Sequence, residues 1–131
     1  MRILVFGGGR MGLARASHLA NCLECAITLI EPQDQTAKTF LEQVPGAIRA
    51  ENIQEAIECG ADGAFICTPP RSHYYFARAC LEARIPTLIE KPSTLTLSEA
   101  QGLVSLRHGL GVPAFVGYHN RASTSVSFLK H

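Results

Sequence analysis

The sequence predicts an α/β fold, with a doubly wound parallel sheet in a single domain. Short apolar segments of strand length alternate with longer segments of helical periodicity from residue 3 to residue 117. The first of these segments, residues 3–6, is apolar throughout, as a parallel strand that is buried on both faces should be. With 131 residues, the chain has room for one domain with a substantial core but hardly for two.

Six strands and five helices follow from this alternation. The expected strands are residues 3–6, 26–30, 47–49, 64–67, 87–90 and 113–117. The expected helices are residues 11–22, 35–43, 53–58, 72–83 and 96–108. Asn52 and Gly60 are suited to begin and end the third helix, while Thr96 and Glu99 have the spacing of a capping box that opens the fifth.

The composition is that of a soluble globular protein, with 47% apolar and 18% charged residues. The net charge of +1 gives no electrostatic reason to expect a nucleic acid or a membrane surface as a partner. The longest apolar runs are of strand length and far shorter than a membrane span. Because the N-terminus also lacks the pattern of a signal peptide, we expect a cytoplasmic protein.

The five cysteines do not suggest a disulfide framework, because their number is odd and the chain can build a core without one. Cys22 and Cys25 form a C-x-x-C pair, which is either a redox pair, half of a zinc site, or two small apolar residues between a helix and a strand. A zinc site needs two more ligands, and no second C-x-x-C or H-x-x-x-H follows. We therefore favour the structural interpretation and expect no metal.

A glycine-rich motif follows the first expected strand and opens the first expected helix. It matches G-x-G-x-x-G and consists of Gly7, Gly8, Gly9, Arg10, Met11 and Gly12. In a Rossmann fold, Gly7 allows the tight turn, Gly9 lets the backbone approach a pyrophosphate, and Gly12 permits close packing of helix on strand. The alternative is a turn whose glycines serve flexibility alone. In this context we expect a dinucleotide at the helix N-terminus, bound by residues 7 and 9–12.

Glu31 ends the second expected strand, 19 positions after Gly12. The dinucleotide fingerprint has an acidic residue about 20 positions on, where it holds the ribose hydroxyls. Two like charges about 4 Å apart repel by about 1 kcal/mol in water and about 4 kcal/mol near a protein surface, so a carboxylate here favours NAD over NADP. No Arg or Lys lies in the next six positions to bind a 2′-phosphate. The alternative interpretation is an exposed glutamate in a turn.

Three further polar loops follow the fourth, fifth and sixth expected strands. They are residues 68–73, 90–92 and 118–121. In a parallel sheet, loops that follow the strands all lie at the carboxyl edge, where open α/β sheets bind their ligands. We therefore expect these loops to converge on the cleft at which the glycine motif presents the cofactor.

The residues of these loops resemble those of a known family. Thr-Pro-Pro-Arg-Ser-His at 68–73, Glu-Lys-Pro at 90–92 and Ser-Glu-Ala at 98–100 are similar to motifs of the glucose–fructose oxidoreductase and inositol dehydrogenase family. The resemblance covers residues 1–121. It implies the NAD-binding domain of a dehydrogenase that transfers a hydride between a nicotinamide cofactor and a sugar or polyol hydroxyl.

The resemblance also implies roles for residues of the cleft. It assigns the cofactor side to Thr68, Pro69, His73, Glu90, Lys91 and Arg121. Lys91 is the expected catalytic residue, which reaches the substrate hydroxyl beside the nicotinamide, with Glu90 helping to position it. A neighbouring cationic nicotinamide favours the neutral form of a lysine, which suits proton transfer. The alternatives are a solvated lysine at 91 and a capping or packing histidine at 73.

The last residues of the chain bear on where a substrate would bind. We expect residues 1–118 to form the dinucleotide-binding domain and residues 119–131 to begin the connection to a substrate domain that this chain lacks. Ala122 and Thr124 stand where the family has an aromatic residue and a proline. A hydride-transfer site needs a substrate wall as well as a cofactor wall, so we expect the chain alone to be inactive.

Two other functions are compatible with the sequence, namely a non-catalytic NAD-binding module and a different nucleotide binder such as a methyltransferase.

Without a second domain, an apolar face around the last strand becomes exposed. We expect homo-oligomers to form through this face.

Overall fold

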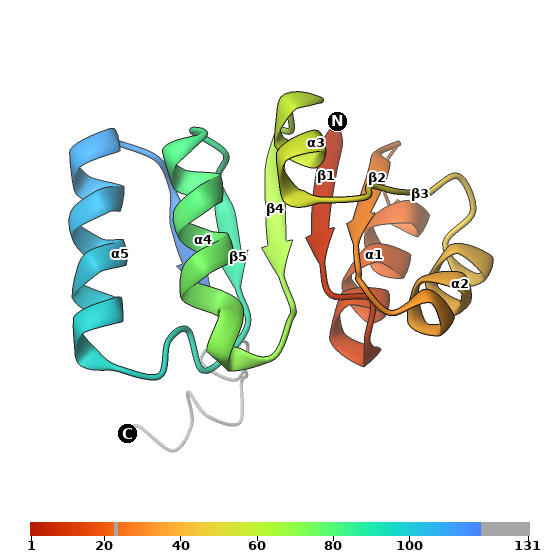
Figure 1. Ribbon diagram of the computed structural model, residues 1–131. Helices are drawn as coiled ribbons and strands as arrows, with labels where there is room; N and C mark the ends of the chain where they lie inside the picture. Colours follow the sequence, from red (N-terminus) through yellow and green to blue (C-terminus); the bar gives the residue numbers. More distant parts are fainter. Residues whose placement is uncertain (23, 119–131) are drawn as a thin grey trace, which may run out of the picture.

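A six-stranded parallel sheet forms the centre of the molecule (Figure 1). The computed structural model describes residues 1–22 and 24–118. The strands are β1 (Arg2–Phe6), β2 (Ala26–Ile30), β3 (Ile48–Arg49), β4 (Gly63–Ile66), β5 (Thr87–Ile89) and β6 (Ala114–Val116). Their order in the sheet is β3-β2-β1-β4-β5-β6, and every neighbouring pair is parallel. This is the doubly wound order of dinucleotide-binding folds, so the predicted fold class is confirmed.

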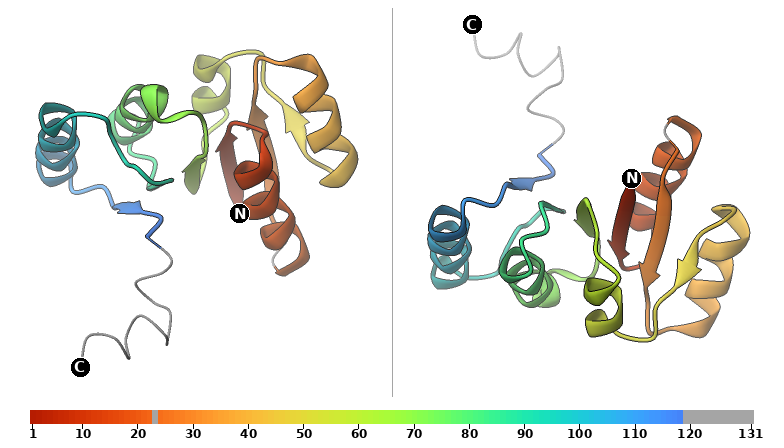
Figure 2. Two further views of the ribbon diagram at one scale, coloured as in Figure 1. Left: turned by 90° about the horizontal axis from the view of Figure 1, so that it is seen from below. Right: turned by 90° about the horizontal axis from the view of Figure 1, so that it is seen from above.

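Helices cover both faces of the sheet (Figure 1 and Figure 2). They are α1 (Arg10–Cys22), α2 (Asp34–Gln43), α3 (Ile53–Glu58), α4 (His73–Glu82) and α5 (Leu97–Leu110). The buried side chains of α1 and α2 pack in one hydrophobic cluster, and those of α3, α4 and α5 pack in the other. Each parallel connection therefore passes over the sheet through a helix, as right-handed crossovers require.

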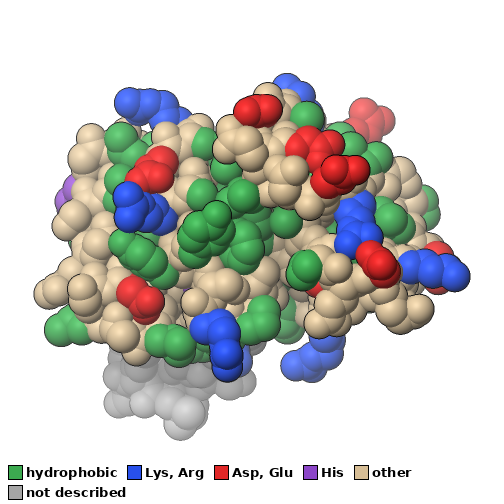
Figure 3. Space-filling view, viewed as in Figure 1, with side chains coloured by type: hydrophobic (Ala, Val, Ile, Leu, Met, Phe, Trp, Pro, Cys, Tyr) green, Lys and Arg blue, Asp and Glu red, His purple; other side chains and the backbone are tan. Residues whose placement is uncertain are grey.

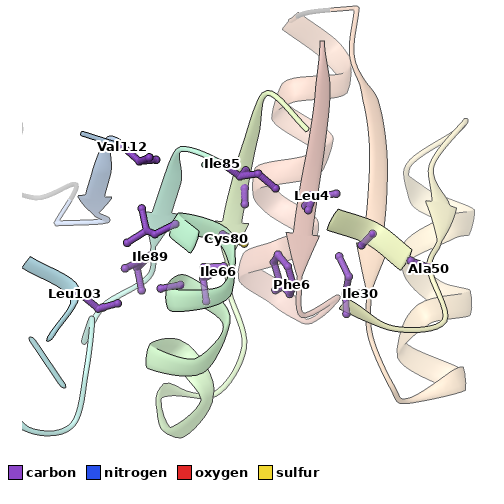
Figure 4. Close-up of a cluster of buried hydrophobic side chains, with 14 residues drawn as sticks. Leu4, Phe6, Ile30, Ala50, Ile66, Cys80, Ile85, Ile89, Leu103 and Val112 are labelled. Carbon is purple, nitrogen blue, oxygen red and sulfur yellow. The ribbon is translucent and has the colours of Figure 1, made fainter. Parts of the chain in front are cut away.

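The strand β1 lies between the two clusters. Leu4 and Phe6 point into the cluster beneath α3, α4 and α5, to which Ile66 and Ile89 also belong (Figure 4). The alternate residue Val5 points into the cluster beneath α1 and α2. All three side chains are buried, which explains why the strand is apolar at every position rather than at every second one.

The helix ends follow the capping signals in the sequence. The Asn52 side chain accepts a hydrogen bond from the Glu55 amide at 2.9 Å, and Thr96 and Glu99 form the predicted capping box at the start of α5. The helix α5 continues two residues beyond the expected end, because Gly111 adopts a left-handed conformation that stops it there.

Other element boundaries differ slightly from expectation. The first residues of the expected fourth helix form a separate 3₁₀ turn, Pro70–Ser72, so α4 begins at His73. Cys67 and Glu90 lie just beyond β4 and β5, although their amides still donate to the neighbouring strands. Both residues thus stand where the sheet ends and the loops of the carboxyl edge begin.

One face of the sheet is less covered towards β6. Phe65, Leu88 and Phe115 are register partners across β4, β5 and β6, and they lie on the same face as Val5. Phe65 and Leu88 are half-buried, and Phe115 is 61% exposed. The expected apolar face around the last strand is therefore present, and self-association through it stays a prediction.

The opposite face, which α3, α4 and α5 cover, exposes both hydrophobic and charged side chains. Hydrophobic side chains gather over α4 and towards α3, with charged side chains of both signs around them (Figure 3). Tyr75 of α4 is 60% exposed on this helix. None of the helices in the described part of the chain is long and apolar enough to cross a membrane.

Candidate functional site

The turn between β1 and α1 can be built only with glycine at two positions. Gly7 has a positive φ of 91°, and a Cβ there would lie 2.9 Å from the Cys67 carbonyl oxygen. A Cβ on Gly12 would overlap the carbonyl oxygen of Gly7, because the helix passes directly over the turn. By contrast, a Cβ on Gly9 would meet no atom within 4 Å and would enter open space. The backbone at Gly9 is thus accessible from the cleft.

The helix α1 begins at this turn. The Leu13 amide donates to the Gly9 carbonyl oxygen at 2.9 Å, and Arg10 and Met11 form the first helical turn. The first amides of a helix have no partner within the helix, and the helix dipole adds positive potential there. The turn therefore presents a site suited to a phosphate group.

Glu31 lies beside the glycine turn, as its spacing predicts. Its Oε2 accepts from the Gly8 amide and its Oε1 from the Gln33 amide, both at 2.9 Å. These two bonds fix the half-buried carboxylate at the end of β2. An ionised carboxylate has about four acceptor positions, so it retains acceptors for hydroxyl groups of a ligand.

A cleft of about 460 Å³ opens at the carboxyl edge, which is the lower edge in Figure 1. It is lined by Arg10, Met11, Thr68, Pro70, His73, Glu90 and Lys91. These residues follow β1, β4 and β5, so the cleft lies at the point where the strand order reverses. The structure brings six of the predicted site residues together in this lining. Its size is within the range of small-molecule sites.

One predicted residue of the polar loops is not part of this lining. Pro69 precedes the 3₁₀ turn and is exposed, and the adjacent Pro70 lines the cleft instead. The chain turns tightly between the two prolines, which the sequence pattern does not reveal. Arg121 lies outside the described residues.

His73 joins two loops of the site. The imidazole is buried, with Nδ1 2.8 Å from the Pro92 carbonyl oxygen and Nε2 2.7 Å from the Thr68 carbonyl oxygen. The loop after β4 is thereby tied to the loop that carries Lys91. His73 is thus buried by packing and also lines the cleft, and its contact with a cofactor stays a prediction.

Glu90 has a partner that the sequence analysis missed. Its side chain is only 6% exposed, and its Oε1 accepts from Nη2 and Nε of Arg15 at 2.7 and 3.1 Å. Arg15 lies on α1, three residues after Gly12. The signal was indirect, because a carboxylate at the end of a buried strand needs a cation nearby. The ion pair anchors the Lys91 loop to the helix that begins at the glycine turn.

The cysteines contribute no reactive thiolate to the cleft. Burial raises the pKa of the Cys67 thiol to about 12; the Glu90 carboxylate acts in the same direction, and Arg15 acts against it. Cys22 and Cys25 are free thiols. Within residues 1–22 and 24–118, no group of three or more His, Cys, Asp or Glu side chains is placed to bind a metal ion.

Loss of Arg15 should destabilise the fold. In Arg15→Met the Glu90 carboxylate is left buried without its cation, and we expect the free energy of unfolding to fall by about 3 kcal/mol, the lower end of the range for broken buried pairs. Urea denaturation measures this change. In Arg15→Met/Glu90→Gln the buried charge is gone, so at least about 1 kcal/mol should return.

The matched control is Arg78→Met, since Arg78 pairs with Glu82 on the exposed surface of α4. This variant should unfold like the wild type. Equal losses in Arg15→Met and in the double variant would show that Arg15 contributes through packing and not through its charge.

The chain is similar to known proteins in sequence and in fold. Residues 1–118 match the model of an oxidoreductase family with an NAD-binding Rossmann fold. A myo-inositol dehydrogenase from Streptomyces leeuwenhoekii is 29% identical over 118 residues, which cover 90% of this chain and 36% of that protein. A UDP-N-acetylglucosamine 3-dehydrogenase from Acidithiobacillus ferrooxidans is 27% identical over 130 residues, which cover 99% of this chain and 41% of that protein. The chain thus spans well under half the length of these relatives.

Two solved structures share the architecture. The UDP-N-acetylglucosamine 3-dehydrogenase from Acidithiobacillus ferrooxidans matches with a TM-score of 0.88 at 23% identity, over 99% of this chain and 42% of that one. GenD2 from gentamicin A biosynthesis, in complex with NAD, matches with a TM-score of 0.82 at 24% identity, over 89% of this chain and 34% of that one. At these identities the likeness concerns the fold alone. The chain belongs to the Gfo/Idh/MocA oxidoreductase family, as the resemblance predicts, and residues 1–118 correspond to its NAD-binding Rossmann domain.

Proposed function

We propose that this chain is the cofactor half of an NAD-dependent dehydrogenase that acts on a sugar or cyclic polyol, with Lys91 as its proton-transferring residue. The observation that carries the proposal is the cleft itself. It brings the start of α1, the buried His73 and Lys91 to one site at the switch point of the sheet. The names of the two curated relatives, a myo-inositol and a UDP-sugar dehydrogenase, support this substrate class.

The residues of the cleft fit an NAD molecule. The open space above Gly9 matches a pyrophosphate that approaches the backbone, and the fixed Glu31 carboxylate beside it matches a ribose. Thr68, His73 and Lys91 would then face the nicotinamide end. When bound, the nicotinamide ring supplies the acceptor or donor of the hydride.

We infer that Lys91 moves the accompanying proton. It is exposed in the lining of the cleft and directly follows the buried Glu90, which Arg15 holds. As the carbinol carbon of the substrate loses a hydride, its hydroxyl must lose a proton. The neutral amine of Lys91 accepts that proton, and its ammonium returns a proton in the reverse direction. Glu90 acts by fixing the loop and thus the reach of the lysine.

The described cleft accounts for the cofactor and for Lys91, and a hydride-transfer site needs a substrate wall as well. We propose that residues 119–131 lead towards a substrate domain, and that the 131-residue chain binds NAD without turning over a sugar by itself. The alternative is a non-catalytic NAD-binding module. In such a module Lys91 is dispensable.

The first prediction concerns the choice of cofactor. Calorimetric titration should show NADH binding at least about tenfold more tightly than NADPH, because the Glu31 carboxylate repels a 2′-phosphate. The preference should be largely lost in Glu31→Gln, which keeps the side-chain shape, and in Glu31→Ala. Equal affinities for both cofactors in the wild type would contradict this role of Glu31, and absence of any binding would contradict the proposed function.

The second prediction separates binding from folding within the glycine turn. In Gly9→Ala the new Cβ enters the open space, so NADH affinity should fall at least about tenfold while the free energy of unfolding changes by less than about 1 kcal/mol. In Gly12→Ala the new Cβ overlaps the Gly7 carbonyl, so stability and binding should both be lost. Unchanged NADH affinity in Gly9→Ala would place the pyrophosphate elsewhere.

The third prediction concerns Lys91. When residues 1–118 replace the cofactor domain of the myo-inositol dehydrogenase, Lys91→Met should lower kcat at least about 100-fold, the range of a lost general acid–base group. NADH affinity should change less than about threefold, since the lysine acts on the substrate hydroxyl. Lys38→Met is the control, because Lys38 is an exposed residue of α2 away from the cleft lining. Full activity of the Lys91→Met chimera would favour the non-catalytic module.

A further inference from the structure

An arginine that is distant in sequence reaches the turn that carries Glu31. Arg49 is the last residue of β3, and its guanidinium donates to the Glu31 carbonyl oxygen at 2.9 Å through Nε and to the Pro32 carbonyl oxygen at 3.2 Å through Nη2. Its Nη1 donates to Oδ1 of Asp34 at 2.8 Å. The three bonds hold the guanidinium against the residues that follow β2.

The sheet register explains this contact. Arg49 pairs with Leu29 in the parallel ladder, two residues before Glu31. The long side chain therefore extends along the end of β2 to the turn. Arg49 is not among the residues that closely follow Glu31 in the sequence. The fold, and not the local sequence, brings its guanidinium to this turn.

The net negative charge at this turn repels a phosphate group. Glu31 and Asp34 carry two negative charges and Arg49 one positive charge, so the turn has a net charge of −1. Asp34 is 93% exposed and binds one edge of the guanidinium, whose own side chain is 32% exposed. A guanidinium fork matches phosphate oxygens well, but here the carboxylate of Asp34 occupies part of it.

We propose that Arg49 is a determinant of cofactor specificity, acting as a latent 2′-phosphate site that Asp34 and Glu31 keep closed. In the native chain Arg49 fixes the turn, so that Glu31 faces the ribose hydroxyls. Without the two carboxylates the same turn has a net charge of +1, and the Nη1 edge of the guanidinium, which Asp34 binds in the native chain, can bind the 2′-phosphate of NADP. This inference rests on the proposed function, because it concerns the ribose end of the same cleft.

The test compares NADH and NADPH affinities by calorimetry in a short series of variants. The wild type should favour NADH at least about tenfold, and Glu31→Ser/Asp34→Asn should favour NADPH at least about tenfold. Adding Arg49→Met should bring NADPH affinity down to that of NADH and change NADH affinity less than about threefold. Adding Arg49→Lys should retain part of the NADPH preference, since the charge remains while the fork is lost.

Two controls separate charge from folding. Arg78→Met in the same double variant should leave both affinities unchanged, because Arg78 lies in an exposed ion pair on α4. NADPH binding to Glu31→Ser/Asp34→Asn should also weaken with added salt more steeply than NADH binding does. A purely structural role of Arg49 would lower both affinities together and would not respond to salt.

The outcomes distinguish the two proposals. A wild-type chain that binds neither cofactor overturns the proposed function. An NADPH to NADH ratio that Arg49→Met does not alter in the double variant overturns the role of Arg49. Adenosine 2′,5′-bisphosphate and ADP serve as shorter probes that need no nicotinamide site. Preference of Glu31→Ser/Asp34→Asn for the bisphosphate, lost on Arg49→Met, supports the latent site even where the full cofactors bind weakly.

Discussion

The close approach of α1 to the end of β1 is the constraint on which the rest of the site depends. Because neither Gly7 nor Gly12 has a Cβ, the helix begins directly over the strand end and its first amides face the cleft. The same geometry sets the direction of α1, which places Arg15 within reach of Glu90 on the far side of β4. The glycine turn therefore positions a phosphate-binding helix end and, through Arg15, one of the anchors of the Lys91 loop.

Polar contacts beneath the cleft join loops that are far apart in the sequence. Arg15 ties α1 to the loop after β5, and His73 ties that loop to the one after β4. Each tie uses a buried polar group that is costly to leave without a partner, so the loops have one favoured arrangement. A rigid set of loops is what a site for hydride transfer needs, since the reacting groups must be held in a narrow range of geometries.

Features set by local sequence could be predicted, and features set by the sheet register could not. Short segments rich in apolar residues indicated the strands, the Thr96–Glu99 spacing indicated a helix start, and the interval from Gly12 to Glu31 predicted a carboxylate beside the glycine turn. Arg15 and Arg49 were missed because their partners lie in other elements, 75 and 15 residues away along the chain. Pro70 lines the cleft in place of the predicted Pro69, because a 3₁₀ turn begins at Pro70. Two consecutive prolines in the sequence do not specify such a turn.

The strand order also separates the residues proposed to select the cofactor from the residue proposed to transfer the proton. The turn with Glu31 follows β2 and the Lys91 loop follows β5, with β1 and β4 between them. Three steps between neighbouring strands amount to about 14 Å, which exceeds the distance of about 8–10 Å over which exposed charges interact at physiological salt. A change of charge at Glu31, Asp34 or Arg49 should therefore alter which dinucleotide binds and leave the proposed proton transfer by Lys91 unaffected. On the proposed function, the cofactor preference would thus depend on the ends of β2 and β3 alone, while Lys91, the proposed proton-transferring residue, would stay the same.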